Sequence, residues 1–281
     1  MSTYQRAADL PNFENPPVVE VVLSIQFDPI VHLQTVQIGL LWAKFRREFP
    51  KVEERGPLNP VVERFGAPAS PKIGVRFEAR EIPPLARVLF LNAPENQLVQ
   101  VQPDRFIHNW RKTTGMGEYP RYGTIREAFL REVDLFEQFL TEEALGELCI
   151  NQCEVTYINH IVADSAWRGH GDADKIFDLV RTPSTGTFLP QPEDVSMQAR
   201  YQISVRDRKP IGRLHVSIQP GWRKPDNTPI YILELTARGA PVGTSIEGAR
   251  SFFDIGHDWI VRGFKDITAP TMHDLWRLTN G

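Results

Sequence analysis

The residues of this chain that could most clearly do chemistry lie at the end of the stretch 100–112, which reads QVQPDRFIHNWRK. Trp110 is followed there by Arg111 and Lys112. A tryptophan flanked by cations can stack a base or hold a carboxylate or phosphate. In the alternative interpretation Trp110 anchors the sheet while the two cations face water. We favour this second interpretation, in which the stretch is a hinge between a sheet and a helix.

A second group of candidates consists of histidines and carboxylates on predicted strands: His160, His215, Glu154 and Glu234. Imidazole and carboxylate groups can ligate a metal, but the spacing of these residues matches no metal signature. The sequence also contains no GxxxxGK[ST] phosphate loop, GxSxG elbow or HExxH helix. A dinucleotide site would need a glycine-rich turn after the first strand, and none is present. We therefore expect no metal and no cofactor, assign no catalytic residue, and favour a non-enzymatic role.

His257 is the last candidate, and it belongs to the final predicted helix. It shares an apolar stripe with Phe253, Ile260 and Phe264. A lone histidine on such a face is usually a core residue that donates to a carbonyl or carboxylate. As a general base it would need a partner and a substrate cleft. Asp258 lies four residues before Arg262, a spacing that predicts an ion pair on the helix surface.

Composition limits the class of protein. The 281 residues are 41% hydrophobic and 24% charged, which is ordinary for a soluble globular protein. A formal net charge of -3 argues against a general nucleic-acid or membrane binder. There is no apolar run of about 18 residues and no signal-peptide pattern at the start. Cys149 and Cys153 are too close along one predicted strand to bridge easily, so we expect reduced cysteines and a cytoplasmic location.

Alternation of apolar and polar residues is the strongest structural signal, and Val19 to Phe27 shows it best. Further strands are predicted at 72–80, 87–91, 98–102, 153–161, 197–206, 211–219 and 229–237. Helices are predicted at about 38–49, 124–144 and 172–181, and from 244 onward. Pro-rich loops occupy 56–71 and 182–192. Both long helices open on Thr-x-x-Glu, from Thr124 and from Thr244, which is the pattern of a capping box.

The order strand, helix, three strands, helix occurs twice. We therefore predict an α+β protein of two pseudo-repeated halves, 1–146 and 147–281, packed closely together. Short turns between consecutive strands predict antiparallel pairing, with the helices covering one face of each sheet. The alternative is two unrelated α+β halves that share only their helix-capping chemistry.

The sheet face away from the helices is predicted to be polar. In the first half it carries Glu20, Ser24, Gln26, Arg76, Glu78, Arg80, Arg87, Gln100 and Gln102. In the second half it carries Glu154, Thr156, His160, Gln198, Arg200, Gln202, Ser204, Arg213, His215, Ser217, Gln219, Glu234 and Thr236. Such a face is either a solvated surface or a binding surface. Its apolar members, Val22, Ile158, Ile230 and Ile232, favour binding because they would otherwise be exposed.

Three separated blocks resemble an uncharacterised, sporadically distributed bacterial protein family. They are NPPVVEVVLSIQF at 15–27, the stretch 100–112 with YPRY at 119–122, and HDWIVRGF at 257–264. His108 departs from the family pattern, which has an aromatic or apolar residue there. The resemblance implies no established activity. The sporadic distribution suggests a mobile locus, of the defence or toxin–antitoxin type.

These observations favour a cytoplasmic interaction protein that uses the polar sheet face to bind another protein. The candidate binding residues are Trp110, Arg111, Lys112, Glu154, His160, Arg200, Arg213, His215 and Glu234. The first alternative is a small-ligand receptor or enzyme, with a cleft between the sheet and the C-terminal helix lined by Arg200, His215, Glu154 and Glu234. The second alternative is nucleic-acid binding through Trp110, Arg111, Lys112 and the second-half arginines. No membrane partner is expected.

Overall fold

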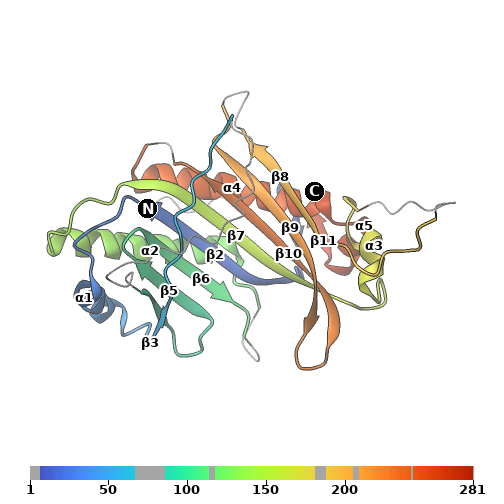
Figure 1. Ribbon diagram of the computed structural model, residues 1–281, viewed down its shortest axis with the longest axis horizontal. Coiled ribbons are helices and arrows are strands. Elements are labelled where there is room, and N and C mark those ends of the chain that lie inside the picture. Colours follow the sequence, from blue (N-terminus) through green and yellow to red (C-terminus); the bar gives the residue numbers. More distant parts are fainter. Residues whose placement is uncertain are drawn as a thin grey trace.

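One antiparallel sheet of nine strands organises the molecule, in the order β3-β4-β5-β6-β2-β7-β10-β9-β8 (Figure 1). The structure is a computed structural model that describes residues 7–66, 86–113, 118–180, 188–204, 209–241 and 243–280. The strands of this sheet are β2 (Val18–Phe27), β3 (Lys51–Arg55), β4 (Arg87–Leu91), β5 (Gln97–Gln102), β6 (Arg105–Arg111), β7 (Ile150–Val162), β8 (Met197–Ile203), β9 (Gly212–Arg223) and β10 (Thr228–Gly239). A separate antiparallel pair joins β1 (Asn12–Phe13) to β11 (Leu278–Asn280).

The helices cover one face of this sheet. They are α1 (Thr35–Phe45), α2 (Arg121–Glu142), α3 (Ala173–Ile176), α4 (Ile246–Ile267) and α5 (Pro270–Leu275), with a 3-10 turn η1 at His170–Asp172. The long helices α2 and α4 lie behind the sheet in Figure 1. The predicted α+β class, with antiparallel strands and helices on one face, is therefore confirmed.

The centre of the sheet is the antiparallel pair β2–β7. Outward from it the order is β6, β5, β4 and β3 on one side and β10, β9 and β8 on the other, so the two sides are built alike except for the additional edge strand β3. Both predicted halves, 1–146 and 147–281, thus contribute strands to one sheet rather than forming two. The internal duplication and the boundary between the halves stay predictions.

The alternation of apolar and polar residues in β2 correctly predicted which side chains from Val21 to Ile25 are in the core. Val21, Leu23 and Ile25 are fully buried beneath the helices. At the start of β2, however, Val18 is buried while Val19 is only half-buried. The pairing of β2 with β7 shifts register between Val18 and Glu20, and such a bulge reverses which residues face the core.

The other face of the sheet is crossed by residues 56–66, which we call the crossing segment and which runs in front of the strands in Figure 1. The side chain of Gln102 of β5 accepts from the Leu58 amide and donates to the Leu58 carbonyl, each at 3.0 Å. Further along, Gln26 of β2 accepts from the Val61 amide at 2.9 Å, and Gln152 of β7 accepts from the Glu63 amide at 3.2 Å. Part of the predicted polar face therefore binds the chain's own backbone.

Several element predictions need correction. Residues 105–111 form the strand β6, not a hinge between sheet and helix. Helix α2 begins before Thr124, so that residue cannot be its cap. Helix α4 is capped by Ser245 rather than Thr244, since the Ser245 hydroxyl accepts from the Gly248 amide at 3.4 Å. The strand β3 was missed. The predicted strand at 72–80, with Arg76, Glu78 and Arg80, lies outside the described residues.

Two predictions, one about the cysteines and one about membrane-spanning segments, can be compared with the structure. Cys149 and Cys153 are both free, as expected. Burial raises the pKa of the Cys153 thiol well above its ordinary value, so this thiol is unreactive. Within the described ranges no helix is long and apolar enough to cross a bilayer.

Candidate functional site

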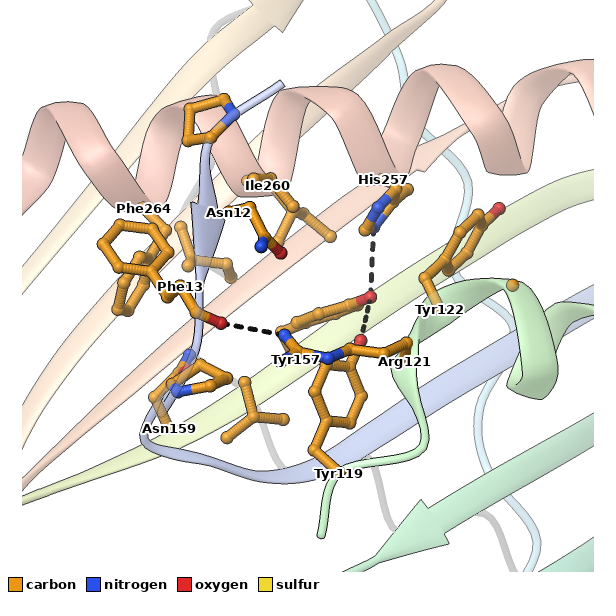
Figure 2. Close-up of a pocket in the computed structure, with 16 residues that line it drawn as sticks. Asn12, Phe13, Tyr119, Arg121, Tyr122, Tyr157, Asn159, His257, Ile260 and Phe264 are labelled. Atoms are coloured by element: carbon orange, nitrogen blue, oxygen red, sulfur yellow. Dashed lines mark hydrogen bonds between the residues drawn. The ribbon is translucent and has the colours of Figure 1, made fainter. Parts of the chain in front are cut away.

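A cavity of about 380 Å³ lies between the sheet and α4 (Figure 2). Its sheet side is formed by Tyr157 and Asn159 of β7 and Leu235 of β10, and its helix side by residues of α4 that include His257, Ile260 and Phe264. The remaining walls are the N-terminal segment around β1 and the start of α2. Residues two apart on a strand and three or four apart on a helix share a face, so the local periodicities bring these side chains into one space.

Two tyrosines and a histidine form a continuous hydrogen-bonded chain in this cavity. The hydroxyls of Tyr119 and Tyr157 lie 2.8 Å apart, and the Tyr157 hydroxyl lies 3.0 Å from His257 Nδ1. The His257 ring also stacks on Tyr122, with ring centroids 3.8 Å apart. The direction of the chain depends on the tautomer of His257. Tyr119 can therefore offer a ligand either a proton or a lone pair, and His257 can exchange a proton through Tyr157.

A clamp between α2 and α4 fixes this group of rings. Asp254 of α4 accepts hydrogen bonds from Arg126 of α2 at 2.7 and 2.9 Å and from the Tyr122 hydroxyl at 3.0 Å. Burial alone would lower the pKa of Arg126, but the bonds to Asp254 outweigh it and raise that pKa. The bidentate pair thus holds Tyr122 against His257 and sets the spacing of the two helices at the cavity.

Asn159 contributes a polar group that lacks a full set of partners. Its Nδ2 donates to the Leu233 carbonyl at 3.0 Å, which fixes the orientation of the amide. Its Oδ1 is buried and has no hydrogen-bond partner in the part of the chain that the structure describes. Buried polar atoms are nearly always paired, so this oxygen is an exception, and it is closed to solvent on the cavity side as well.

Arg121 lies at the mouth of the cavity in an unusual backbone conformation. Its φ of 70° is in the left-handed region, which a non-glycine residue adopts at a cost of about 1–3 kcal/mol. Its guanidinium donates to the carbonyls of Phe13 at 2.8 Å and Glu14 at 3.1 Å, and Figure 2 shows it reaching toward Phe13. The side chain therefore links the start of α2 to the N-terminal segment that borders the cavity.

The residues predicted around Trp110 do not form a binding platform. The Trp110 ring is only 4% exposed, faces the helices and contacts Tyr119 with ring centroids 5.4 Å apart. A buried ring cannot stack a base, and Trp110 belongs to the hydrophobic core beneath the helices. Arg111 donates through Nε to the Glu95 carbonyl at 2.6 Å, and Lys112 is exposed. The nucleic-acid alternative loses its proposed stacking residue.

Glu63 of the crossing segment contacts two of the predicted polar-face residues, Arg213 and His215, and lies near Arg238, which was not predicted. Its carboxylate accepts from Arg213 and from His215 Nε2, the latter at 2.6 Å. Arg238 lies 3.7 Å from the same carboxylate and also pairs with Glu154. Glu63 was missed because it lies in a Pro-rich segment without periodicity, where nothing in the sequence signals a sheet contact.

Burial alone would raise the pKa of Glu63, but the hydrogen bonds from His215 and Arg213 outweigh it. The pKa of Glu63 is therefore lowered from its ordinary value of 4.5. A carboxylate with a lowered pKa contributes stability above the unfolded-state pKa and loses it as the pH falls through the folded-state value.

Glu63→Gln is therefore expected to lower the free energy of unfolding by about 2 kcal/mol at neutral pH, because an amide is a weaker acceptor than a carboxylate for charged donors. The difference from the wild type should shrink as the pH falls below 4.5. Urea unfolding at neutral and acid pH measures both. Glu53→Gln, in an exposed pair with Arg55, is the control and should cost little. A loss in unfolding free energy that is equal at every pH would contradict the lowered pKa of Glu63.

The other predicted residues lie apart from this group. Glu234 and Arg200 are exposed, whereas His160 is half-buried and burial lowers its pKa. A cavity does lie between the sheet and α4, as the first alternative expected. The residues expected to line it are on the opposite face of the sheet: Arg200, His215, Glu154 and Glu234.

No group of three or more histidine, cysteine or carboxylate side chains that could hold a metal occurs among the described residues. His257 occupies the apolar stripe of α4, as predicted, and is buried. Arg262, predicted to pair with Asp258, pairs with Asp9 at 2.8 Å.

Comparisons of the chain with family models, with curated proteins and with solved structures give no match. The resemblance to a sporadically distributed bacterial family therefore stays a prediction, as does the mobile locus that it suggests. The feature that bears most directly on function is the gathering of Tyr119, Tyr157, His257, Arg121 and Asn159 around one cavity.

Proposed function

We propose that the protein binds a small, largely apolar molecule in the cavity between the sheet and α4. The observation that carries this proposal is the convergence of two hydroxyls, an imidazole and a guanidinium on an otherwise apolar space of about 380 Å³. Ligand sites in proteins usually have this character, with a few polar groups that fix orientation in an apolar enclosure of about 300–1,000 Å³.

A simple packing defect would not have this lining. Protein interiors are filled to crystal-like density, and the voids that remain are small and few. Here the sheet wall places Leu235 beside Tyr157, and the α4 wall places Ile260 one turn from His257, so each wall combines apolar surface with a polar group. The Arg126–Asp254 clamp and the β1–β11 pair hold the walls apart.

The proposal is tested by a fragment screen on the full chain with isotope-labelled isoleucine δ1-methyl groups. Ile260 lines the cavity, whereas Ile107 is buried on the other sheet face and Ile38 is a buried residue of α1. Fragments that bind should shift the methyl signal of Ile260 and leave those of Ile107 and Ile38 in place. The proposal fails if no fragment binds, or if those that bind leave the Ile260 signal unchanged.

A second candidate function is recognition of a protein partner at the free end of the polar face. It is favoured by β8, which ends the sheet order and exposes Gln198, Arg200, Tyr201 and Gln202. The crossing segment reaches β9 through Arg213 and His215, one strand short of this edge. An edge strand with exposed side chains can pair with a strand of another chain.

Arg200→Glu is expected to abolish capture of such a partner from a lysate of the native host, because reversing a charge in an interface repels the complementary group. Arg46→Glu, an exposed arginine just after α1, is the matched control and should still capture it. Mass spectrometry of the captured material measures both. Equal recovery with the two variants would remove β8 from the interface.

A further inference from the structure

The described part of the cavity lining carries a positive side chain and no negative one, and this affects which ligands the proposed site would accept. Among the described residues, sixteen line the cavity, and they include one arginine, one histidine and no aspartate or glutamate. Asp254, which binds Tyr122 of this lining, is already paired with Arg126. A ligand in the cavity would therefore meet positive charge at Arg121, and the described part of the wall holds no competing carboxylate.

The start of α2 adds to this positive character. Tyr122 and Gly123, in the first turn of this 22-residue helix, both line the cavity. The N-cap is Pro120, which has no side-chain acceptor, and the first turn contains no acidic residue. The partial positive charge of a helix N-terminus favours anions, and here no carboxylate of the first turn neutralises it.

The guanidinium of Arg121, the first residue of α2, adds a full positive charge to that of the helix N-terminus. Arginine has five N–H donors, and the two bonds to the Phe13 and Glu14 carbonyls leave others available. Those two bonds and the ring of Tyr119, 5.6 Å from the guanidinium carbon, hold the group at the mouth of the cavity. A planar guanidinium held in place matches the two oxygens of a carboxylate.

We propose that the cavity takes small apolar molecules that carry one carboxylate, with Arg121 binding the carboxylate at the mouth and the apolar body lying between β7 and α4. This inference rests on the proposed ligand-binding function. A single guanidinium balances the one charge of a carboxylate and leaves a phosphate dianion with an uncompensated charge.

The test uses matched fragments that share one ring system and carry a carboxylate, a primary amide or a primary alcohol. Affinities are measured by titration of the Ile260 methyl signal in the wild type, Arg121→Gln and Arg262→Gln. The carboxylates should bind the wild type about tenfold more tightly than their amides, as expected for a hydrogen bond to a charged group. Arg121→Gln should remove this preference, and high salt should weaken it. Arg262→Gln removes the same charge from α4 outside the cavity and should preserve it.

The outcomes separate the two proposals. If no fragment of any type shifts the Ile260 signal, the ligand-binding function itself fails. If amides and alcohols bind as tightly as carboxylates, the cavity binds ligands but the carboxylate inference is wrong. If Arg121→Gln weakens all three types equally, Arg121 only supports the cavity wall through Phe13 and Glu14, and its role as the anion-binding group is overturned.

Discussion

Replacing Val261 by tryptophan is expected to weaken fragment binding about 100-fold, or about 2.7 kcal/mol. Val261 lines the cavity from α4 and is only half-buried, so an indole can enter the open space without displacing packed core side chains. The added ring would occupy much of the volume that the ligand needs. Isothermal titration calorimetry with a fragment that shifts the Ile260 signal measures the loss.

The matched control for this substitution is Val36→Trp. Val36 is on α1, is 71% exposed and does not line the cavity. Val36→Trp adds the same apolar ring to the protein and should leave fragment affinity unchanged. It also reveals any nonspecific binding of fragments to an exposed tryptophan. Equal affinity in Val261→Trp and the wild type would show that the fragments bind somewhere else.

His108→Ala is expected to lower the free energy of unfolding by about 3 kcal/mol. His108 is 1% exposed, and its Nδ1 lies 2.8 and 3.0 Å from the two carboxylate oxygens of Glu132 on α2. The Glu132 side chain is itself only 6% exposed. Removing the imidazole leaves a buried carboxylate without this partner, which costs much more than the pair contributes. Urea unfolding at neutral pH measures the loss.

The double variant His108→Leu with Glu132→Leu is the control for this prediction. Two apolar side chains of similar volume need no hydrogen-bond partners, so the double variant should be more stable than His108→Ala. A double variant that is less stable than His108→Ala would show that the polar pair stabilises the fold in its own right. A loss below about 1 kcal/mol in His108→Ala would contradict the burial of the pair.

The strands and the direction of their faces could be predicted because alternation is a local property of the sequence. Leu23 and Ile25 are buried and Gln26 and Gln102 point the other way for that reason. The bulge near Val18 could not be predicted, because it depends on how β2 meets a strand more than a hundred residues later. His108 was noticed in the sequence as out of place, and only the structure supplies Glu132 as its reason.

The candidate site was harder to predict than the fold, because its parts are distant in sequence. Tyr157 and His257 each lie on a predicted apolar face, but their contact joins residues a hundred positions apart. The left-handed backbone of Arg121 has no signature in a sequence, since that conformation is usual for glycine. The crossing segment escaped prediction because proline-rich sequence has no period from which a contact with Gln26 or Gln152 could be inferred.

A crystal structure of the full chain soaked with the tightest-binding fragment tests the central claim most directly. The account predicts fragment density in the cavity between β7 and α4, in contact with Tyr157 and His257. Density confined to another surface, such as the groove between α1 and α2 lined by Lys44 and Arg131, would contradict it.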